Sequence, residues 1–260
     1  MSAVIGWNNL VKTATLHANS EDLPIGNIAT DSGSAADAWQ TEAGDVTLAT
    51  GALFSVTPAP ASTWRVLGLF RTNLTSNAVV HFGLWNNGSP PTLVTDVTAS
   101  PVDGYGQAVA VLPTDTTADF LQVYIEDSGN PDNFINVPLA YAGPAWFPAR
   151  SIGWSSTVGR DVSRADVITR GGQEYPSLNF RRRRWNVQLE SLLTAEVWGS
   201  VDDLLLTADT GTNVLFAPDA DGDYLQREAV FGRLSAMADV SFPYQSADRR
   251  RWSAQITERL

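Results

Sequence analysis

Two short stretches of the sequence each contain a run of consecutive arginines, seven in the two runs together, and each continues as an alternating apolar and polar segment. They read FRRRRWNVQLESL from Phe180 and DRRRWSAQITERL from Asp248. Guanidinium groups pair with carboxylates through two parallel hydrogen bonds, so arginine runs suit contacts with acidic partners. Such runs are also often solvated beside local acids at a protein surface. The candidate interface residues are Arg181, Arg182, Arg183, Arg184, Arg249, Arg250 and Arg251.

Strand geometry predicts where these arginines lie. Successive side chains of a strand point to opposite faces, so Trp185 and Val187 share a face with Arg183. In the second stretch, Trp252 shares a face with Arg250 in the same way. We therefore expect both tryptophans in a core. If the two strands pair in one sheet, we expect all seven arginines at one end of it. Either local acids or the acidic face of another copy or another protein would then neutralise them.

Residues suited to catalysis are few. The chain has two histidines, His17 and His81, and the alternating strand around His81 favours a structural role. Motifs of phosphate-binding loops, serine hydrolases and zinc proteases are missing from the sequence, and GYGQAV from Gly104 lacks the third glycine and the helix of a dinucleotide site. Adjacent acids such as Glu126 and Asp127 diverge on a strand, although carboxylates from distant strands would suit a glycosidase. We expect no enzymatic activity and no cofactor.

Two loops are candidate ligand sites. DADGDY, from Asp219 to Tyr224, resembles half of a calcium-binding loop but lacks the closing glutamate and the helices. An Asp-Gly hairpin turn is the favoured interpretation, so no metal site is predicted, while calcium at Asp219–Asp223 stays an open alternative. Aromatic and amide side chains in a second set would stack on and hydrogen-bond a saccharide, or would simply end a strand and form a turn. This set is Trp85, Asn86, Asn87 and Tyr105.

Composition limits the classes of function. The 260 residues are 43% hydrophobic, enough for a substantial core, and the lack of cysteine excludes disulfides and thiolate chemistry. The net charge of −11 argues against duplex nucleic acid as a partner. The opening MSAVIGWNN lacks the basic and apolar regions of a secretion signal, and no apolar run is long enough to span a bilayer. We expect synthesis in a host cytoplasm without a signal peptide and without membrane insertion.

Charge and turn residues divide the chain into two predicted domains. Residues 1–143 hold three basic and 13 acidic residues, a net charge of −10, whereas residues 144–260 hold 14 arginines and 15 acidic residues, a net charge of −1. The seam, YAGPAWFPAR from Tyr141, contains one glycine and two prolines, which interrupt strands. In residues 1–143, short alternating runs such as TWRVLGLF and DFLQVYIED are separated by turn clusters. This pattern predicts a β-sandwich or jelly roll.

The first domain also resembles a known family. NSEDLPIGNIATDSGSAADAWQT, which contains Asn27, Ile28 and Trp39, is followed by WRVLGLFRTNLTSNAVVHFGLW. These segments resemble the opening loop and the central strands of discoidin-like, galactose-binding-type jelly rolls, over roughly residues 15 to 140. The cysteine pair of many discoidin domains is missing. The resemblance implies a galactose-binding-like β-sandwich that contacts carbohydrate.

The second domain is predicted to be a β-rich α+β fold with one helix. TAEVWGSVDDLLLTADTG places apolar residues at helical spacing over about 194–209, with Thr194 as the N-cap and Gly211 just beyond the end. Strand patterns precede and follow this segment. One amphipathic helix packed on a sheet is the architecture that this order favours.

The second domain resembles proteins of tailed-bacteriophage tail tips. The segments that carry the resemblance are PAWFPARSIGW, the GGQEY turn, the predicted helix, and NVLFAPD followed by REAVFGRL. The chain is similar in role to distal-tail proteins, which form a ring at the end of the tail tube, although their ring-forming domain usually comes first. The resemblance implies a non-enzymatic structural component of a tail tip or baseplate, located in the virion, with a peripheral jelly roll. Its partners would be other copies of itself, other tail proteins and a host-surface saccharide; the alternative is a carbohydrate-binding, receptor-contacting protein.

Overall fold

The computed structural model is mostly β and describes residues 2–168, 170–237, 240–241 and 248–259. The chain divides into two compact units. The first contains the residues up to Pro148 together with Leu215–Phe231, and the second contains Ala149–Val214 and Gly232–Arg259. The predicted division after residue 143 differs from these units in one main respect, because Leu215–Phe231 belongs to the first.

The first unit is a β-sandwich with jelly-roll topology, which confirms the predicted fold. Its larger sheet has the order β2 (Thr15–Ala18), β4 (Leu53–Thr57), β9 (Phe120–Glu126), β6 (Val79–Asn86) and β7 (Thr92–Ala99). Its smaller sheet has the order β11 (Leu139–Gly143), β5 (Ser62–Phe70) and β8 (Ala108–Ala118). All of these neighbouring strands are antiparallel.

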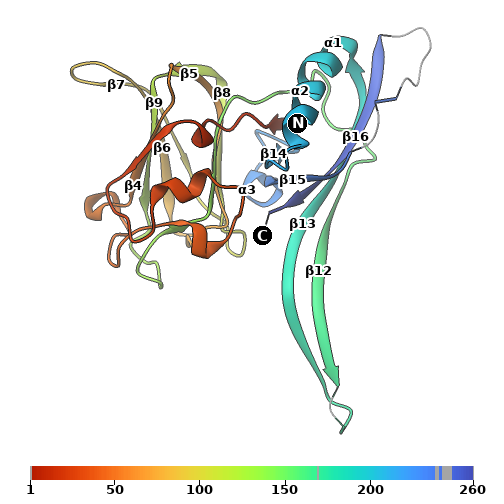
Figure 1. Ribbon diagram of the computed structural model, residues 1–260, viewed down its shortest axis with the longest axis horizontal. Helices are drawn as coiled ribbons and strands as arrows, with labels where there is room; N and C mark the ends of the chain where they lie inside the picture. Colours follow the sequence, from red (N-terminus) through yellow and green to blue (C-terminus); the bar gives the residue numbers. More distant parts are fainter. Residues whose placement is uncertain (1, 169, 238–239, 242–247, 260) are drawn as a thin grey trace. The chain divides into compact units, whose positions relative to one another are not determined.

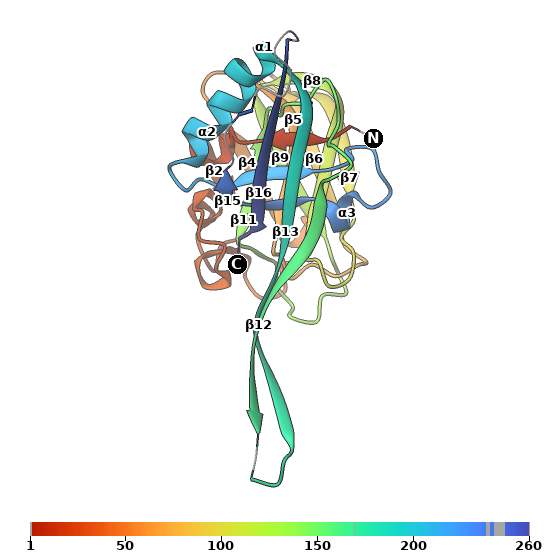
Figure 2. The same ribbon diagram turned by 90° about the vertical axis from the view of Figure 1, so that its right-hand side faces the viewer.

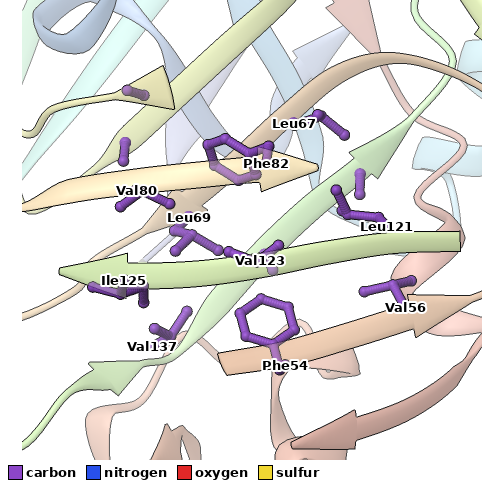
Figure 3. Close-up of a cluster of buried hydrophobic side chains, with 14 of the residues drawn as sticks. Phe54, Val56, Leu67, Leu69, Val80, Phe82, Leu121, Val123, Ile125 and Val137 are labelled. Atoms are coloured by element: carbon purple, nitrogen blue, oxygen red, sulfur yellow. The ribbon is translucent and has the colours of Figure 1, made fainter. Parts of the chain in front are cut away.

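The core of the sandwich is built from alternate residues of both sheets. Because side chains of a strand alternate between faces, each strand contributes every second residue. Figure 3 shows these side chains pointing toward one another between the strands. From the two sheets they include Phe54, Val56, Leu67, Leu69, Val80, Phe82, Leu121, Val123 and Ile125, and Val137 joins them from a short separate strand; all are buried.

Short helical turns and a small two-stranded sheet accompany the two sheets of the sandwich, and most of them lie in the first 50 residues. The short helical turns are η1 (Leu10–Lys12), η2 (Ile25–Ala29), η3 (Ala35–Asp37) and η4 (Leu48–Thr50), and β3 (Trp39–Gln40) pairs with β10 (Asn136–Val137). Trp39 is fully buried, and its indole nitrogen donates to the carbonyl oxygen of Ser20 at 2.9 Å. The Asn27 amide donates to the carbonyl oxygen of Ala38 at 2.9 Å. The Asn and Trp of the opening loop therefore hold that loop in place.

The segment Leu215–Phe231 completes the first unit. Its residues Leu215–Ala217, from β14 (Val214–Ala217), pair antiparallel with β1 (Val4–Gly6), and α3 (Leu225–Glu228) follows. The Gln226 side chain accepts from the main-chain N–H of Val109 at 2.8 Å and donates to its carbonyl oxygen at 2.6 Å. Gln226 thus satisfies the peptide groups of β8 at this point as a neighbouring strand would. Phe231 packs against Phe70 and Tyr141 in a second apolar cluster.

The second unit is a sheet and one helical run. The sheet order is β15 (Val230–Met237), β16 (Arg249–Glu258), β13 (Glu174–Leu193) and β12 (Thr157–Ile168). The helical run consists of α1 (Thr194–Glu196), the π-helical turn η5 (Val197–Val201) and α2 (Asp202–Ala208), which confirms the helix expected over about 194–209. Its buried stripe is Val197, Val201, Leu204 and Ala208, while Trp198 stays exposed.

A long hairpin is the most prominent feature of the second unit. β16 pairs with β13 from Arg184 to Leu193, whereas β12 pairs with β13 along its whole length, to Ile168 opposite Glu174. The two strands therefore continue past the end of β16 as a two-stranded ribbon, which both Figure 1 and Figure 2 show. This ribbon, Arg160–Ile168 with Glu174–Arg183, is called the hairpin arm below.

Candidate assembly interface

The two arginine runs do not meet. β13 and β16 are antiparallel, with Arg184 opposite Thr257 and Leu193 opposite Arg249. Nine residues of strand, about 30 Å, separate these two pairs. The expectation that all seven arginines gather at one end of the sheet is therefore wrong, because antiparallel pairing sends the two copies of the motif to opposite ends. Trp185 and Trp252 are nevertheless both buried, as predicted.

The first arginine run is largely neutralised within its own unit. Arg183 is buried and forms a two-pronged ion pair with Glu258, whose Oε2 accepts from the Arg183 Nε at 3.1 Å while Oε1 accepts from Nη2. Asp161 accepts from Arg184 at 2.7 Å and from Arg182 at 3.3 Å. Local acids thus occupy three of the four guanidinium groups, and Arg181 is the exposed member.

The second arginine run contacts main-chain oxygens. Arg249 Nη1 donates to the carbonyl oxygen of Ser191 at 3.1 Å, and Arg250 Nη1 donates to the carbonyl oxygen of Arg249 at 3.0 Å. Arg251 is exposed, and its backbone forms a bridge with Ser241. This end of the sheet presents Arg251 as its most accessible guanidinium group.

The hairpin arm exposes apolar side chains, which the arginine pattern of the sequence did not predict. Both faces of its strands are open to solvent along most of their length. Its exposed large apolar residues range from 39% for Phe180 to 64% for Ile168. A single two-stranded hairpin is marginally stable in water, and exposed apolar surface of this kind marks a contact surface. These residues are Val162, Val167, Ile168, Tyr175, Leu178 and Phe180.

The predicted saccharide residues do not form one site. Trp85 and Asn86 end β6, and the main-chain N–H of Asn87 donates to Asp119 at 2.6 Å. Tyr105 lies in the turn that follows β7, whose last residue is opposite Val80. Five residues of β6, roughly 16 Å, separate Val80 from Trp85. Tyr105 therefore lies toward the opposite end of the sandwich from the other three residues.

The DADGDY segment forms a turn. The main-chain N–H of Gly222 donates to the carbonyl oxygen of Asp219 at 3.4 Å, and Asp221 and Asp223 point into solvent. Burial, followed by the nearby Asp219 carboxylate, raises the pKa of Glu228 above its ordinary value. Within the described residues no group of three or more acidic or histidine side chains is arranged to hold a metal ion.

Comparisons with known proteins gave matches to solved structures alone. No family model matches the chain, and no curated protein matches it. The lectin domain of lectinolysin in complex with Lewis B antigen is similar at 9% identity and a TM-score of 0.41, covering 52% of this chain and 95% of that domain. A Streptococcus pneumoniae fucose-binding module is similar at 11% identity and a TM-score of 0.42, covering 53% of this chain and 96% of the module.

A third similar structure is the family 32 carbohydrate-binding module of C. perfringens NanJ in complex with galactose. It has 15% identity and a TM-score of 0.40, and covers 53% of this chain and 98% of the module. Among the described residues, no helix has the length and apolar character needed to cross a membrane. The jelly-roll fold of the first unit rests on its own strand order and register.

Proposed function

We propose that the chain is a non-enzymatic structural subunit of a phage or phage-like tail tip or baseplate, and that the hairpin arm joins it to its neighbours. The observation that carries this proposal is the arm itself. Six large apolar side chains are exposed on a two-stranded ribbon. Among the described residues, each strand of the ribbon pairs only with the other strand of the hairpin, so both outer edges are open. A neighbouring subunit would cover both the apolar side chains and the open strand edges.

The physical reason is the cost of leaving such a ribbon uncovered. Open strand edges carry unpaired N–H and C=O groups that pair readily with other strands, and monomeric proteins usually shorten or cover them. The arm is long, and its outward residues mix apolar side chains with arginines and acids such as Arg164 and Asp166. Mixed apolar and charged surface suits a specific contact between subunits.

The choice of a tail tip rests on the resemblance of residues 144–260 to tail-tip proteins. On this proposal the partners are other copies of the chain and other tail proteins, and the protein is located in the virion. No cofactor is needed for such a role. The jelly roll would be a peripheral module.

Light scattering across a range of protein concentrations tests the proposal. We expect the full chain to form a defined oligomer. A variant in which Asn-Gly replaces residues 163–180, joining the paired residues Val162 and Arg181, should stay monomeric. Leu178→Ser should weaken association, whereas Leu206→Ser, an equally exposed leucine on α2, should not.

Two results would overturn the proposal. If the full chain is a monomer that also fails to bind isolated tail-tip proteins, no neighbour covers the arm. If the shortened arm leaves the oligomer unchanged, another surface holds the subunits together.

Carbohydrate binding by the jelly roll is the second candidate function. The observation that favours it is a set of parallel aromatic side chains on the outward face of the larger sheet. Titration with saccharides tests it, and the two functions are compatible because they use different units of the chain.

A further inference from the structure

The outward face of the larger sheet has an unusual composition. Its strands bury alternate residues in the core shown in Figure 3, so the residues between them point outward. Gly83, on β6, lies between two polar residues of this face, because the register places Gln122 opposite it on β9 and Asp96 opposite it on β7. Gln122 and Asp96 are thus two strand spacings apart, about 10 Å, on either side of a position without a side chain.

Two parallel aromatic pairs flank this position. On one side, the rings of Trp85 and Phe120 are 6.5 Å apart and within 8° of parallel. On the other side, the rings of His81 and Tyr124 are 4.2 Å apart and within 11° of parallel. A Cβ at Gly83 would lie 2.9 Å from the indole nitrogen of Trp85, so glycine makes room for that ring to lie over the strand.

The charge of this face is negative. Asp96 lies 3.5 Å from His81 Nδ1, and Glu126 is the next outward residue of β9 after Tyr124. Burial is the largest cause that raises the pKa of Tyr124 above its ordinary value, and the neighbouring carboxylates of Asp96 and Glu126 raise it further. The outward positions of the five strands carry no lysine or arginine. They are Thr15, His17, Leu53, Ser55, Thr57, Val79, His81, Gly83, Trp85, Leu93, Asp96, Thr98, Phe120, Gln122, Tyr124 and Glu126.

We infer that this outward face, hereafter the aromatic face, binds a chain of amino sugars whose amines are protonated. Trp85 and Tyr124 contact the apolar faces of two different sugar rings of the chain, and Asp96 accepts a hydrogen bond from an ammonium group. Gln122 is placed to bond sugar hydroxyls. The inference rests on the carbohydrate-binding role proposed above, and it specifies the surface and the charge of the ligand.

Two features favour an amino sugar over other ligands. An anionic sugar is disfavoured because the outward positions of the face present carboxylates but no lysine or arginine side chains. A basic peptide would be attracted by those carboxylates but has no need of two parallel aromatic pairs, which suit the flat apolar faces of pyranose rings. The combination of aromatic pairs with a flanking carboxylate therefore selects a ring that carries a cation.

Calorimetric titration of the full chain tests the inference at mildly acidic pH and low salt. The ligands are a glucosamine oligomer, its N-acetylated counterpart and a neutral glucose oligomer, all of the same length. We expect the glucosamine oligomer to bind at least about tenfold more tightly than the other two, because a hydrogen bond between charged groups contributes about that factor. Asp96→Asn should remove this preference, whereas Asp103→Asn, in an exposed loop, should keep it.

Aromatic variants complete the test. Trp85→Ala should weaken binding of the glucosamine oligomer at least about tenfold, whereas Trp154→Ala, a fully exposed tryptophan of the second unit, should not. Gln122→Ala provides a second variant on the same face that leaves the aromatic pairs intact.

Three outcomes would overturn the inference, and they differ in what they leave standing. Equal binding of neutral and cationic oligomers would leave carbohydrate binding in place and refute the charge preference. Equal binding of an oligolysine, unaffected by Trp85→Ala, would show that the carboxylates attract any cation. If no saccharide binds, carbohydrate binding by the jelly roll fails together with the inference.

Discussion

The ion pair between Arg183 and Glu258 makes a sharp prediction about the stability of the second unit. Glu258→Gln keeps the size of the side chain but removes its charge, leaving Arg183 buried without its carboxylate. Loss of one partner of a fully buried pair costs about 3–5 kcal/mol. The two side chains are 10% and 17% exposed, so solvent screens part of the effect, and we expect a loss of about 2–4 kcal/mol.

Hydrogen exchange followed by mass spectrometry measures this loss in the second unit alone. A loss of about 2–4 kcal/mol corresponds to amide protection in β13 and β16 that falls roughly 30- to 1,000-fold. Peptides from the jelly roll serve as an internal reference. Their protection should stay unchanged.

An exposed ion pair supplies the matched control. Arg164 and Asp166 are 3.2 Å apart, but their side chains are 64% and 40% exposed. Asp166→Asn should therefore cost no more than about 0.5 kcal/mol. The reasoning is refuted if the two variants lose equal stability, or if Arg183→Met combined with Glu258→Gln costs the full sum of the two single losses.

Three further predictions concern other parts of the fold. Gly232→Ala should destabilise the second unit in urea, because the new Cβ would lie 2.0 Å from the carbonyl oxygen of Thr257 in β16. The control is Gly199→Ala, which has open space around its Cβ position and should be neutral or stabilising by up to ~1 kcal/mol. Gln226→Ala should lower the melting temperature of the first unit, because the main-chain N–H and C=O of Val109 both lose their hydrogen-bond partner. The expected decrease in the free energy of unfolding is about 1–3 kcal/mol. Burial raises the pKa of Tyr141, so the folded state keeps a proton that the unfolded chain releases above about pH 10. Stability should then fall as the pH rises further, by up to ~1.4 kcal/mol per pH unit from this group, and Tyr141→Phe should have a shallower alkaline slope in urea titrations.

Alternation along single strands was enough to predict the sandwich and its core. In DFLQVYIED, the apolar residues Leu121, Val123 and Ile125 are all buried, as their spacing indicates. The same alternation predicted the burial of Trp185 and Trp252, and helical spacing of apolar residues predicted the helical run after Leu193. These features depend on neighbours within about ten residues, so the local sequence contains the information that decides them.

Features that depend on pairing between distant segments were not predicted. The composition of β13 and β16 is the same whether the strands run parallel or antiparallel, and that choice alone decides where the two arginine runs lie. The sequence does contain a pattern typical of the two strands of the hairpin arm. Alternating residues continue through GRDVSRADVI and QEYPSLNF, on the two sides of Gly171 and Gly172. Their apolar positions would have been assigned to a core by the same rule that worked for the jelly roll.

The return of Leu215–Phe231 to the first unit has a consequence for how the chain acquires its structure during synthesis. The sandwich strands of the first unit have all been synthesised once translation reaches Pro148. β14 and α3 are complete only at Glu228, about 80 residues later. At about 5–20 residues per second this is a delay of roughly 4–16 s, during which β1 has no β14 and the Val109 edge of β8 has no Gln226. The nascent chain thus carries an incomplete first unit while the whole hairpin arm emerges, so the two units mature together rather than one after the other.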